Sequence, residues 1–177
     1  MKYLIALFMF VLFASNLTAQ KNPFIKEYLE RLENSRKYTL LVAKKMPKEK
    51  YNFKASEGSL SFAQNLLHIG YAMDWHSQSL LGDRKARTWQ TDTVFKVANK
   101  SKKQMITLID ETFNEAIKLI SKFEIKKLDE RLDYFGLSRT KRQILMLLAD
   151  HITHHRGQML VYLRLNDIVP PRYVLFQ

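Results

Sequence analysis

Three of the chain's five histidines lie within one short segment, DHITHHRGQ, which spans residues 150–158. Two of them, His151 and His155, are four positions apart, so on a helix they stand about one turn apart on the same face. Imidazole nitrogens are common ligands of divalent metal ions, and a pair with this spacing can chelate one ion. Two ligands rarely hold an ion, so a third is needed. The best candidate is His68, which lies in the apolar stretch LLHI.

A site formed by His68, His151 and His155 would leave coordination positions open, so that a bound metal ion could activate water or another small ligand. The helical wheel predicts that His151 and His155 point inward, because the apolar stripe of Ile144 and Leu148 continues into their face. The apolar neighbours of His68 predict the same for that residue. The alternative is that the three histidines are ordinary core residues, which hydrogen-bond to backbone carbonyls and hold no metal.

Three polar side chains near these histidines are candidates for a supporting role. His154 lies on the shoulder of the apolar stripe, and it is either an alternative ligand paired with His151 or a group that supports the ligands from outside. Gln64 precedes His68 by one turn and Gln158 projects on the ligand face, so either could orient a ligand or a water molecule. A structural role for both glutamines is an equal alternative. The sequence identifies no catalytic side chain beyond these.

Other residues of reactive type are expected to lie away from the histidine face. On the helical wheel Asp74 and Asp150 face other directions, which makes them poor candidates for general bases. We expect His76 to be exposed and Arg156 to form an ion pair with a neighbouring helix or loop. Trp75 shares a face with the candidate ligand on its own helix, and it either borders the pocket or is part of the core.

Four segments have the apolar spacing of helices, and none alternates convincingly with the period of a strand. The first starts with a proline at Pro23, and the second and fourth start with capping boxes at Ser61 and Thr140. The expected helices cover residues 23–46, 61–81, 102–123 and 140–165. The expected connections cover residues 47–59, 83–99 and 124–139, of which the second is a long crossover. We therefore predict an all-α four-helix bundle with a long crossover connection, a fold that commonly holds metal sites.

Residues 1–19 have the pattern of a secretory signal peptide. A positive charge at Lys2 is followed by an uncharged apolar run and then by small and polar residues that end at Ala19. Cleavage after Ala19 would leave a mature domain of residues 20–177, exported to the periplasm or secreted. An N-terminal membrane anchor is the alternative, although the apolar run is short for a bilayer span of about 20 residues.

The composition excludes several classes of site. Cysteine is absent, so a disulfide framework, a thiolate metal ligand and a cysteine nucleophile are all excluded.

The formal net charge is +12, and such an excess of positive charge can favour binding to nucleic acid or to anionic surfaces. The basic residues are spread along the chain in pairs such as Lys44-Lys45 and Lys102-Lys103, without one focused stripe. We therefore expect a solvated basic surface and no nucleic-acid partner.

Two long segments resemble the signature regions of the DinB/YfiT-like superfamily of small four-helix-bundle proteins. They are MPKEKYNFKASEGSLSFAQNLLHIGYAMDW and TKRQILMLLADHITHHRGQMLVYLRLNDIVPP. The resemblance covers nearly all of residues 20–177. It implies that one histidine from the second helix and two from the fourth hold a divalent metal, often nickel or zinc, and these correspond to His68, His151 and His155. His154 matches a frequent extra histidine that is not usually a ligand, and dimers are common in the superfamily.

The resemblance also implies two kinds of activity. Characterised members include transferases that depend on low-molecular-weight thiols and proposed metal-dependent hydrolases, in both of which the metal lowers the pKa of a bound thiol or water. An exported protein would meet few cytosolic thiols, which favours hydrolysis. We therefore expect a metal-dependent hydrolase that acts on a small-molecule substrate. A thiol S-transferase and a non-catalytic metal-binding stress protein are the alternatives.

Overall fold

The computed structural model describes residues 23–173. Four α-helices form most of this part of the chain: α2 (Pro23–Lys45), α3 (Phe62–Asp74), α4 (Lys102–Ser121) and α5 (Lys141–Arg164). The shorter elements are the 3-10 helices η1 (Lys48–Lys50) and η3 (Ile125–Asp129), the π-helix η2 (Trp75–Leu81), and the strands β1 (Arg131–Tyr134) and β2 (Leu137–Thr140). The predicted four-helix bundle is therefore confirmed.

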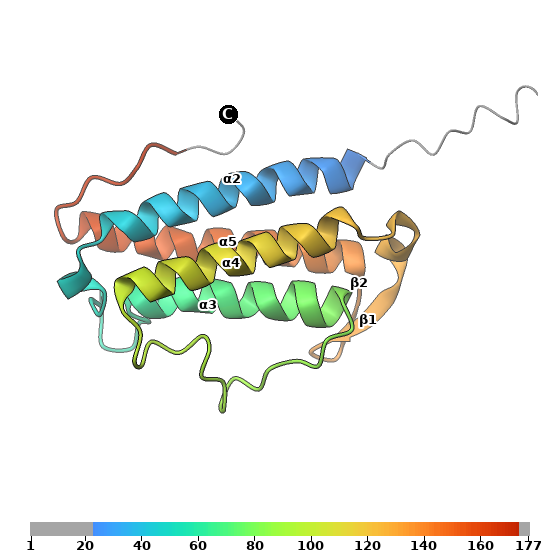
Figure 1. The fold of residues 1–177 in the computed structure, drawn as a ribbon, viewed down its shortest axis with the longest axis horizontal. Helices are drawn as coiled ribbons and strands as arrows, with labels where there is room; N and C mark the ends of the chain where they lie inside the picture. Colours follow the sequence, from blue (N-terminus) through green and yellow to red (C-terminus); the bar gives the residue numbers. More distant parts are fainter. Residues whose placement is uncertain (1–22, 174–177) are drawn as a thin grey trace, which may run out of the picture.

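The four α-helices lie along one common axis, and the connection between α3 and α4 sets their directions (Figure 1). After η2 the chain runs back along the length of the bundle through residues 82–101 before α4 begins. As a result α4 starts at the same end of the bundle as α3 and runs parallel to it, while α2 and α5 run the opposite way (Figure 1). The crossover predicted from the sequence is present in the structure.

Three of the four α-helices begin with a capping box. The side-chain oxygens of Ser61, Ser101 and Thr140 each accept a hydrogen bond from a backbone N–H three residues later, where a glutamine side chain returns the bond. The boxes at Ser61 and Thr140 are those predicted from the sequence, and the one at Ser101 explains why α4 starts at Lys102. These contacts satisfy backbone N–H groups that the start of a helix otherwise leaves unpaired.

An apolar core fills the space between the helices. It includes Leu32 of α2, Leu66 of α3, Phe113 of α4 and Leu148 of α5, and none of these side chains is more than 2% exposed. Burial of large apolar side chains from every helix provides the main stabilisation of the bundle, at about 1.5–3 kcal/mol for each fully buried Leu or Phe. The core therefore fixes the distance between α3 and α5, the two helices that carry the candidate ligands.

Gly70 allows the crossover to approach α3 closely. A Cβ atom at this position would lie 2.7 Å from the ring of Phe95 and 2.6 Å from the side chain of Ile109, closer than real Cβ contacts. Only glycine avoids both clashes without a shift of these neighbours. The crossover is thus held against α3 at a position two residues from His68.

The connection between α4 and α5 contains a β-hairpin where a loop is expected from the sequence. Its two antiparallel strands pair Tyr134 with Leu137 at the turn. The turn residues Phe135 and Gly136 have φ of 54° and 78°, as a tight two-residue hairpin turn requires. Each strand has four residues, which is too short to show a clear period in the sequence. The hairpin is a local exception to the all-α architecture.

The second predicted helix is present over its full length but changes type. After α3 ends at Asp74, the chain continues to Leu81 as the π-helix η2, and Gly82 follows its last residue. Apolar periodicity does not predict this change, because both helix types keep apolar side chains on one side. Short π-helical segments often lie near functional sites, and η2 follows the helix that carries His68.

Within residues 23–173, no helix is both long enough and apolar enough to cross a membrane. The predicted signal peptide at residues 1–19 lies outside the described part of the chain. Export of the protein therefore stays a prediction.

Candidate metal centre

Three histidines meet between α3 and α5; we call His68, His151 and His155 the histidine cluster. His68 projects from α3, and the other two project from successive turns of α5. One ring nitrogen of each lies within 4.8 Å of the corresponding nitrogens of the other two. The ring centroids of His68 and His151 are 5.0 Å apart, and those of the other two pairs are 4.6 Å apart. The structure thus brings together the three residues that the sequence pattern predicts as neighbours.

Asn65 holds the ring of His155 in place. The side-chain amide nitrogen of Asn65 donates to the backbone carbonyls of Leu60 and Ser61, at 3.2 and 3.0 Å. Its Oδ1 atom accepts a hydrogen bond from Nδ1 of His155 at 2.8 Å. Nδ1 of this ring therefore carries the proton, which leaves the lone pair of Nε2 free for a metal ion. Asn65 is fully buried, and the sequence analysis does not identify it as a functional residue.

The other two rings each have a buried nitrogen that lacks a partner. Nδ1 of His68 and Nε2 of His151 form no hydrogen bond within the described residues, so these atoms lack the carbonyl partners expected of ordinary core histidines. A buried polar atom without a partner is costly, and binding to a metal ion would satisfy it. One ring nitrogen of each histidine lies within 4.8 Å of the other two, close enough for the three to share one ion. The donor set fits a divalent ion.

Burial keeps the three imidazoles neutral. It lowers the pKa of His151 from 6.5 to about 4, and the neighbouring histidines add to the effect. In the same way burial, followed by the nearby histidines, lowers the pKa of His155 from 6.5 to about 3. Burial and then the charge of Lys96 lower the pKa of His68. A metal ion binds the unprotonated ring, so the whole cluster is able to bind metal at neutral pH.

The predicted supporting residues lie at the edge of the histidine cluster. His154 is exposed, and its Nε2 atom lies 2.9 Å from the side-chain nitrogen of Gln158. Gln64 is also exposed, and its Oε1 atom accepts a hydrogen bond from the backbone N–H of Ser61 at 2.7 Å in the capping box of α3. Gln64 lines the cavity next to His68 as well. Within residues 23–173, none of the three side chains forms a hydrogen bond with the histidine cluster.

His76 is buried, so the prediction that it is exposed is wrong. It is 2% exposed, its Nδ1 atom donates to the carbonyl of Ala72 at 2.6 Å, and its Nε2 atom accepts from the hydroxyl of Tyr134 at 3.0 Å. Burial lowers its pKa. Trp75 stacks on Tyr134, with ring centroids 5.4 Å apart. The hairpin that covers this side of η2 is distant in the sequence, which is why the helical wheel does not reveal the contact.

Asp74 and Asp150 both form ion pairs with arginines, and neither is part of the histidine cluster. Asp74 is buried and forms ion pairs with Arg84 and Arg87. Asp150 is exposed, and its Oδ1 atom lies 3.8 Å from a guanidinium nitrogen of Arg31. Neither carboxylate belongs to the group of potential metal ligands found in the described part of the chain.

Arg156 joins α5 to α2, but it does so without the predicted ion pair. It is 1% exposed, and burial lowers its pKa. Its Nη1 atom donates to the hydroxyl of Thr39 at 3.5 Å, and its guanidinium lies 5.2 Å from the ring centroid of Tyr38. A hydroxyl and an aromatic ring on α2 therefore take the place of the expected carboxylate.

A cavity of about 370 Å³ opens next to His68. The start of α3 and the crossover line it, with Leu60, Gln64 and His68 on one side and Trp89, Phe95 and Lys96 on the other. Trp89 meets the ring of His68 edge-on, with centroids 5.4 Å apart. The ammonium nitrogen of Lys96 lies 3.4 Å from the ring centroid of Trp89. A molecule in this cavity would therefore meet a candidate ligand, an aromatic ring and a positive charge.

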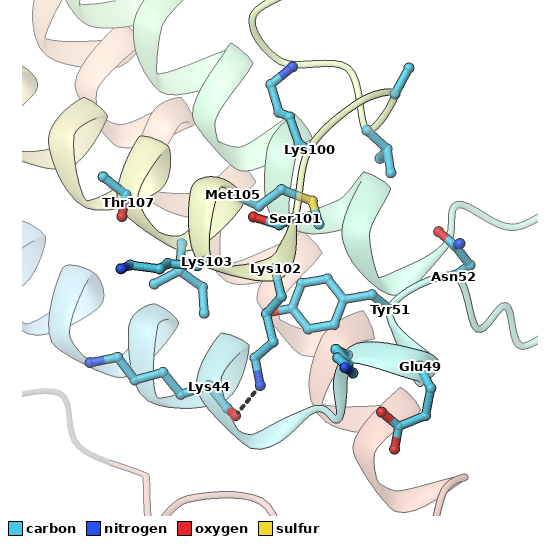
Figure 2. Close-up of a pocket in the computed structure, with 14 residues that line it drawn as sticks. Lys44, Glu49, Tyr51, Asn52, Lys100, Ser101, Lys102, Lys103, Met105 and Thr107 are labelled. Atoms are coloured by element: carbon cyan, nitrogen blue, oxygen red, sulfur yellow. Dashed lines mark hydrogen bonds between the residues drawn. The ribbon is translucent and has the colours of Figure 1, made fainter.

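A larger cavity, of about 1030 Å³, lies between the end of α2 and the start of α4 (Figure 2). Figure 2 shows Lys102 extending toward the backbone of α2. Its ammonium donates to the carbonyls of Lys44 and Met46, at 2.8 and 2.7 Å. This cavity is lined by several lysines but by no member of the histidine cluster. The smaller cavity, unlike the larger one, is therefore lined by a member of the histidine cluster.

The model of the DinB family matches residues 16–173 of the chain. The chain belongs to this family. YjoA from Bacillus subtilis (strain 168) is 24% identical to it over 149 residues, which are 82% of this chain and 90% of that protein. The resemblance proposed from the two sequence segments is therefore confirmed.

Solved structures of similar proteins share the fold. A DinB-like protein from Bacillus cereus ATCC 10987 superposes with a TM-score of 0.67 at 23% identity, over 83% of this chain and 95% of that one. YfiT from Bacillus subtilis superposes with a TM-score of 0.61 at 15% identity, over 85% and 90% of the two chains. YfiT is described as a probable metal-dependent hydrolase with an unusual four-helix bundle topology. At sequence identities of 23% and 15%, these two comparisons establish the fold alone.

Proposed function

We propose that the protein is a metal-dependent hydrolase that acts on a small molecule. The observation that carries the proposal is the convergence of His68, His151 and His155, with a buried, unpartnered nitrogen on two of the three rings. A cavity of about 370 Å³ gives a substrate access to His68. The description of the similar protein YfiT as a probable metal-dependent hydrolase supports the same reaction class.

The surrounding residues would have separate parts in this reaction. A divalent ion bound to three imidazoles acts as a Lewis acid, which lowers the pKa of water and polarises a substrate carbonyl. Asn65 would keep the ring of His155 oriented toward the ion through its hydrogen bond to Nδ1. Trp89 packs edge-on against the ring of His68 and would form part of the wall around a bound substrate. The reaction would add water across an ester or amide bond and release an acid together with an alcohol or amine.

We propose nickel or zinc as the metal. Imidazole nitrogen suits both ions, and three histidines leave open coordination positions. The chain contains no cysteine, and no carboxylate belongs to the cluster of potential ligands within the described residues. Calorimetric titration of the metal-free protein with each ion would compare their affinities directly.

A metal-reconstitution screen tests the proposed reaction. Metal-free protein is loaded with zinc or nickel and assayed on esters and amides, with and without a low-molecular-weight thiol. We expect turnover that requires the metal and does not require the thiol, and nearly complete loss of turnover in His151→Ala. Turnover that requires the thiol would instead identify a thiol S-transferase. Full metal retention without any turnover would identify a non-catalytic metal-binding protein.

We further propose that the chain is exported and that residues 1–19 are removed. The proposal rests on the charged, apolar and small-residue regions of this segment. Mass spectrometry of protein from the native host should find a chain that begins at Gln20, and a chain that retains Met1 would contradict export with cleavage.

A homodimer is proposed from the family resemblance, and sedimentation equilibrium at several concentrations would detect it.

A further inference from the structure

We propose that the cavity next to His68 selects small substrates that carry a carboxylate, and that Lys96 is the residue that recognises this group. The inference rests on the proposed function, because it assumes that the cavity is the substrate pocket of the histidine cluster. Lys96 lines the cavity together with His68. It comes from the crossover, so it belongs to neither of the helices that supply the ligands.

The charges around the cavity favour an anion. The histidine cluster contains no carboxylate, so three neutral imidazoles would leave the double positive charge of a bound ion uncompensated. Lys96 adds a further positive charge to the same cavity, and it forms no ion pair within the described residues. The nearby carboxylate of Asp92 in the crossover pairs with Arg87. Placing two cationic groups side by side is unfavourable. An anionic substrate group would relieve that repulsion.

The position of Lys96 is defined by an aromatic contact. Its ammonium nitrogen lies 3.4 Å from the ring centroid of Trp89, and Trp89 in turn meets the ring of His68. A cation held over an aromatic ring keeps donors free for a ligand, because the ring occupies one side of the ammonium only.

The rest of the lining selects the shape of the substrate. Phe95 of the crossover is buried, and Leu60, Val97 and Ala98 add aliphatic surface to the walls. A volume of about 370 Å³ lies near the lower end of the range for small-molecule sites, roughly 300–1,000 Å³. The cavity therefore suits a compact apolar or aromatic group with one carboxylate, the part of an ester or amide substrate that is held while the bond near the histidine cluster is cleaved.

Binding of simple probes to the zinc-loaded protein tests this inference without requiring turnover. Benzoate and its neutral counterpart benzamide are titrated by calorimetry into wild type, Lys96→Met and Lys96→Arg. The matched control is Lys103→Met, which removes an exposed lysine from the larger cavity. We expect Lys96→Met to weaken benzoate binding by about tenfold or more, since the variant removes the charged donor that would bind the carboxylate. Lys96→Arg should restore most of the affinity, and Lys103→Met should not change it.

Two further measurements separate the possible outcomes. Circular dichroism and elemental analysis of each variant show whether the fold and the metal are retained. Benzamide should bind with similar affinity to wild type and Lys96→Met. Equal benzoate affinity in these two proteins, or no preference of the wild type for benzoate over benzamide, would overturn the role of Lys96. If benzoate binding depends on Lys96 but no ester or amide is hydrolysed, the proposed function fails and the carboxylate site remains.

Discussion

The carboxamide of Asn65 connects the start of α3 to the histidine cluster. It donates to two backbone carbonyls and accepts from Nδ1 of His155, so the ring cannot turn without breaking a buried hydrogen bond. A partner of this kind fixes both the tautomer and the orientation of a ligand. We therefore expect Asn65 to contribute to metal affinity although it would not touch the metal.

Asn65→Ala should weaken metal binding by about 10- to 100-fold, because the ring of His155 loses the partner that orients it. Competition with a chelator of known affinity measures the change. Gln64→Ala is a suitable control, since it removes the neighbouring, exposed side chain and its hydrogen bond to Ser61. That variant should lose some helix stability and keep its metal affinity. Equal affinities in Asn65→Ala and wild type would contradict the role of Asn65.

The buried histidines should make the metal-free protein sensitive to acid. The pKa values of about 4 for His151 and about 3 for His155 lie below the ordinary value of 6.5. Between pH 6.5 and about 4, these residues take up protons in the unfolded chain and stay neutral in the folded one. The free energy of unfolding should therefore fall as the pH falls through this window, and it should not change through these groups above it.

Urea unfolding of the metal-free protein at several pH values measures this effect. His151→Gln removes one of the titrating groups, so its free energy of unfolding should depend less steeply on pH than that of wild type. His154→Gln, which removes an exposed imidazole, is the control. A wild-type slope that His151→Gln leaves unaltered would show that this residue is not a source of the acid sensitivity.

The functional residues differ in how far the sequence predicts them. Helical spacing and apolar neighbours place His68, His151 and His155 on inward faces, because the geometry of a helix fixes these directions. Asn65 and Lys96 have no comparable local pattern. The partner of Asn65 comes from another helix, and the position of Lys96 depends on how an irregular crossover packs its Phe95 against Gly70. Contacts of this kind follow from tertiary packing.

The π-helix η2 and the hairpin β1–β2 are joined through Tyr134. The hydroxyl of Tyr134 donates to Nε2 of His76, and the ring of Tyr134 stacks on Trp75. Since η2 continues directly from α3, the hairpin supports the helix that carries His68. Capping boxes make the starts of α3 and α5 predictable from the sequence, whereas no local rule predicts that a short hairpin covers η2.

Tyr134→Phe should destabilise the protein by about 1–3 kcal/mol, because it leaves Nε2 of the buried His76 without a partner. Urea unfolding monitored by circular dichroism measures the loss. Tyr71→Phe provides the comparison, since its hydroxyl donates to the carbonyl of Arg87 at an exposed position. Its loss should be smaller, below about 1 kcal/mol. A Tyr134→Phe protein as stable as wild type would show that the contact between η2 and the hairpin contributes little.

Metal binding and folding of the bundle are expected to be coupled. The histidine cluster combines one residue of α3 with two of α5, and α4 and the crossover separate these helices in the sequence. The unfolded chain would not hold the three rings together, so an ion binds the folded state preferentially. A metal concentration of about 100 times Kd would stabilise the folded state by about 2.7 kcal/mol. The crossover allows α3 and α4 to run parallel, and it also lines the cavity next to His68.

Elemental analysis of the purified protein tests most directly whether the histidine cluster is a metal centre. The full chain should contain about one divalent ion per molecule after equilibration with zinc or nickel and removal of excess ion, as a three-histidine site requires. The triple variant His68→Ala, His151→Ala, His155→Ala should contain almost none, while His154→Ala should match the wild type. Full metal content in the triple variant, or none in the wild type, would contradict the assignment.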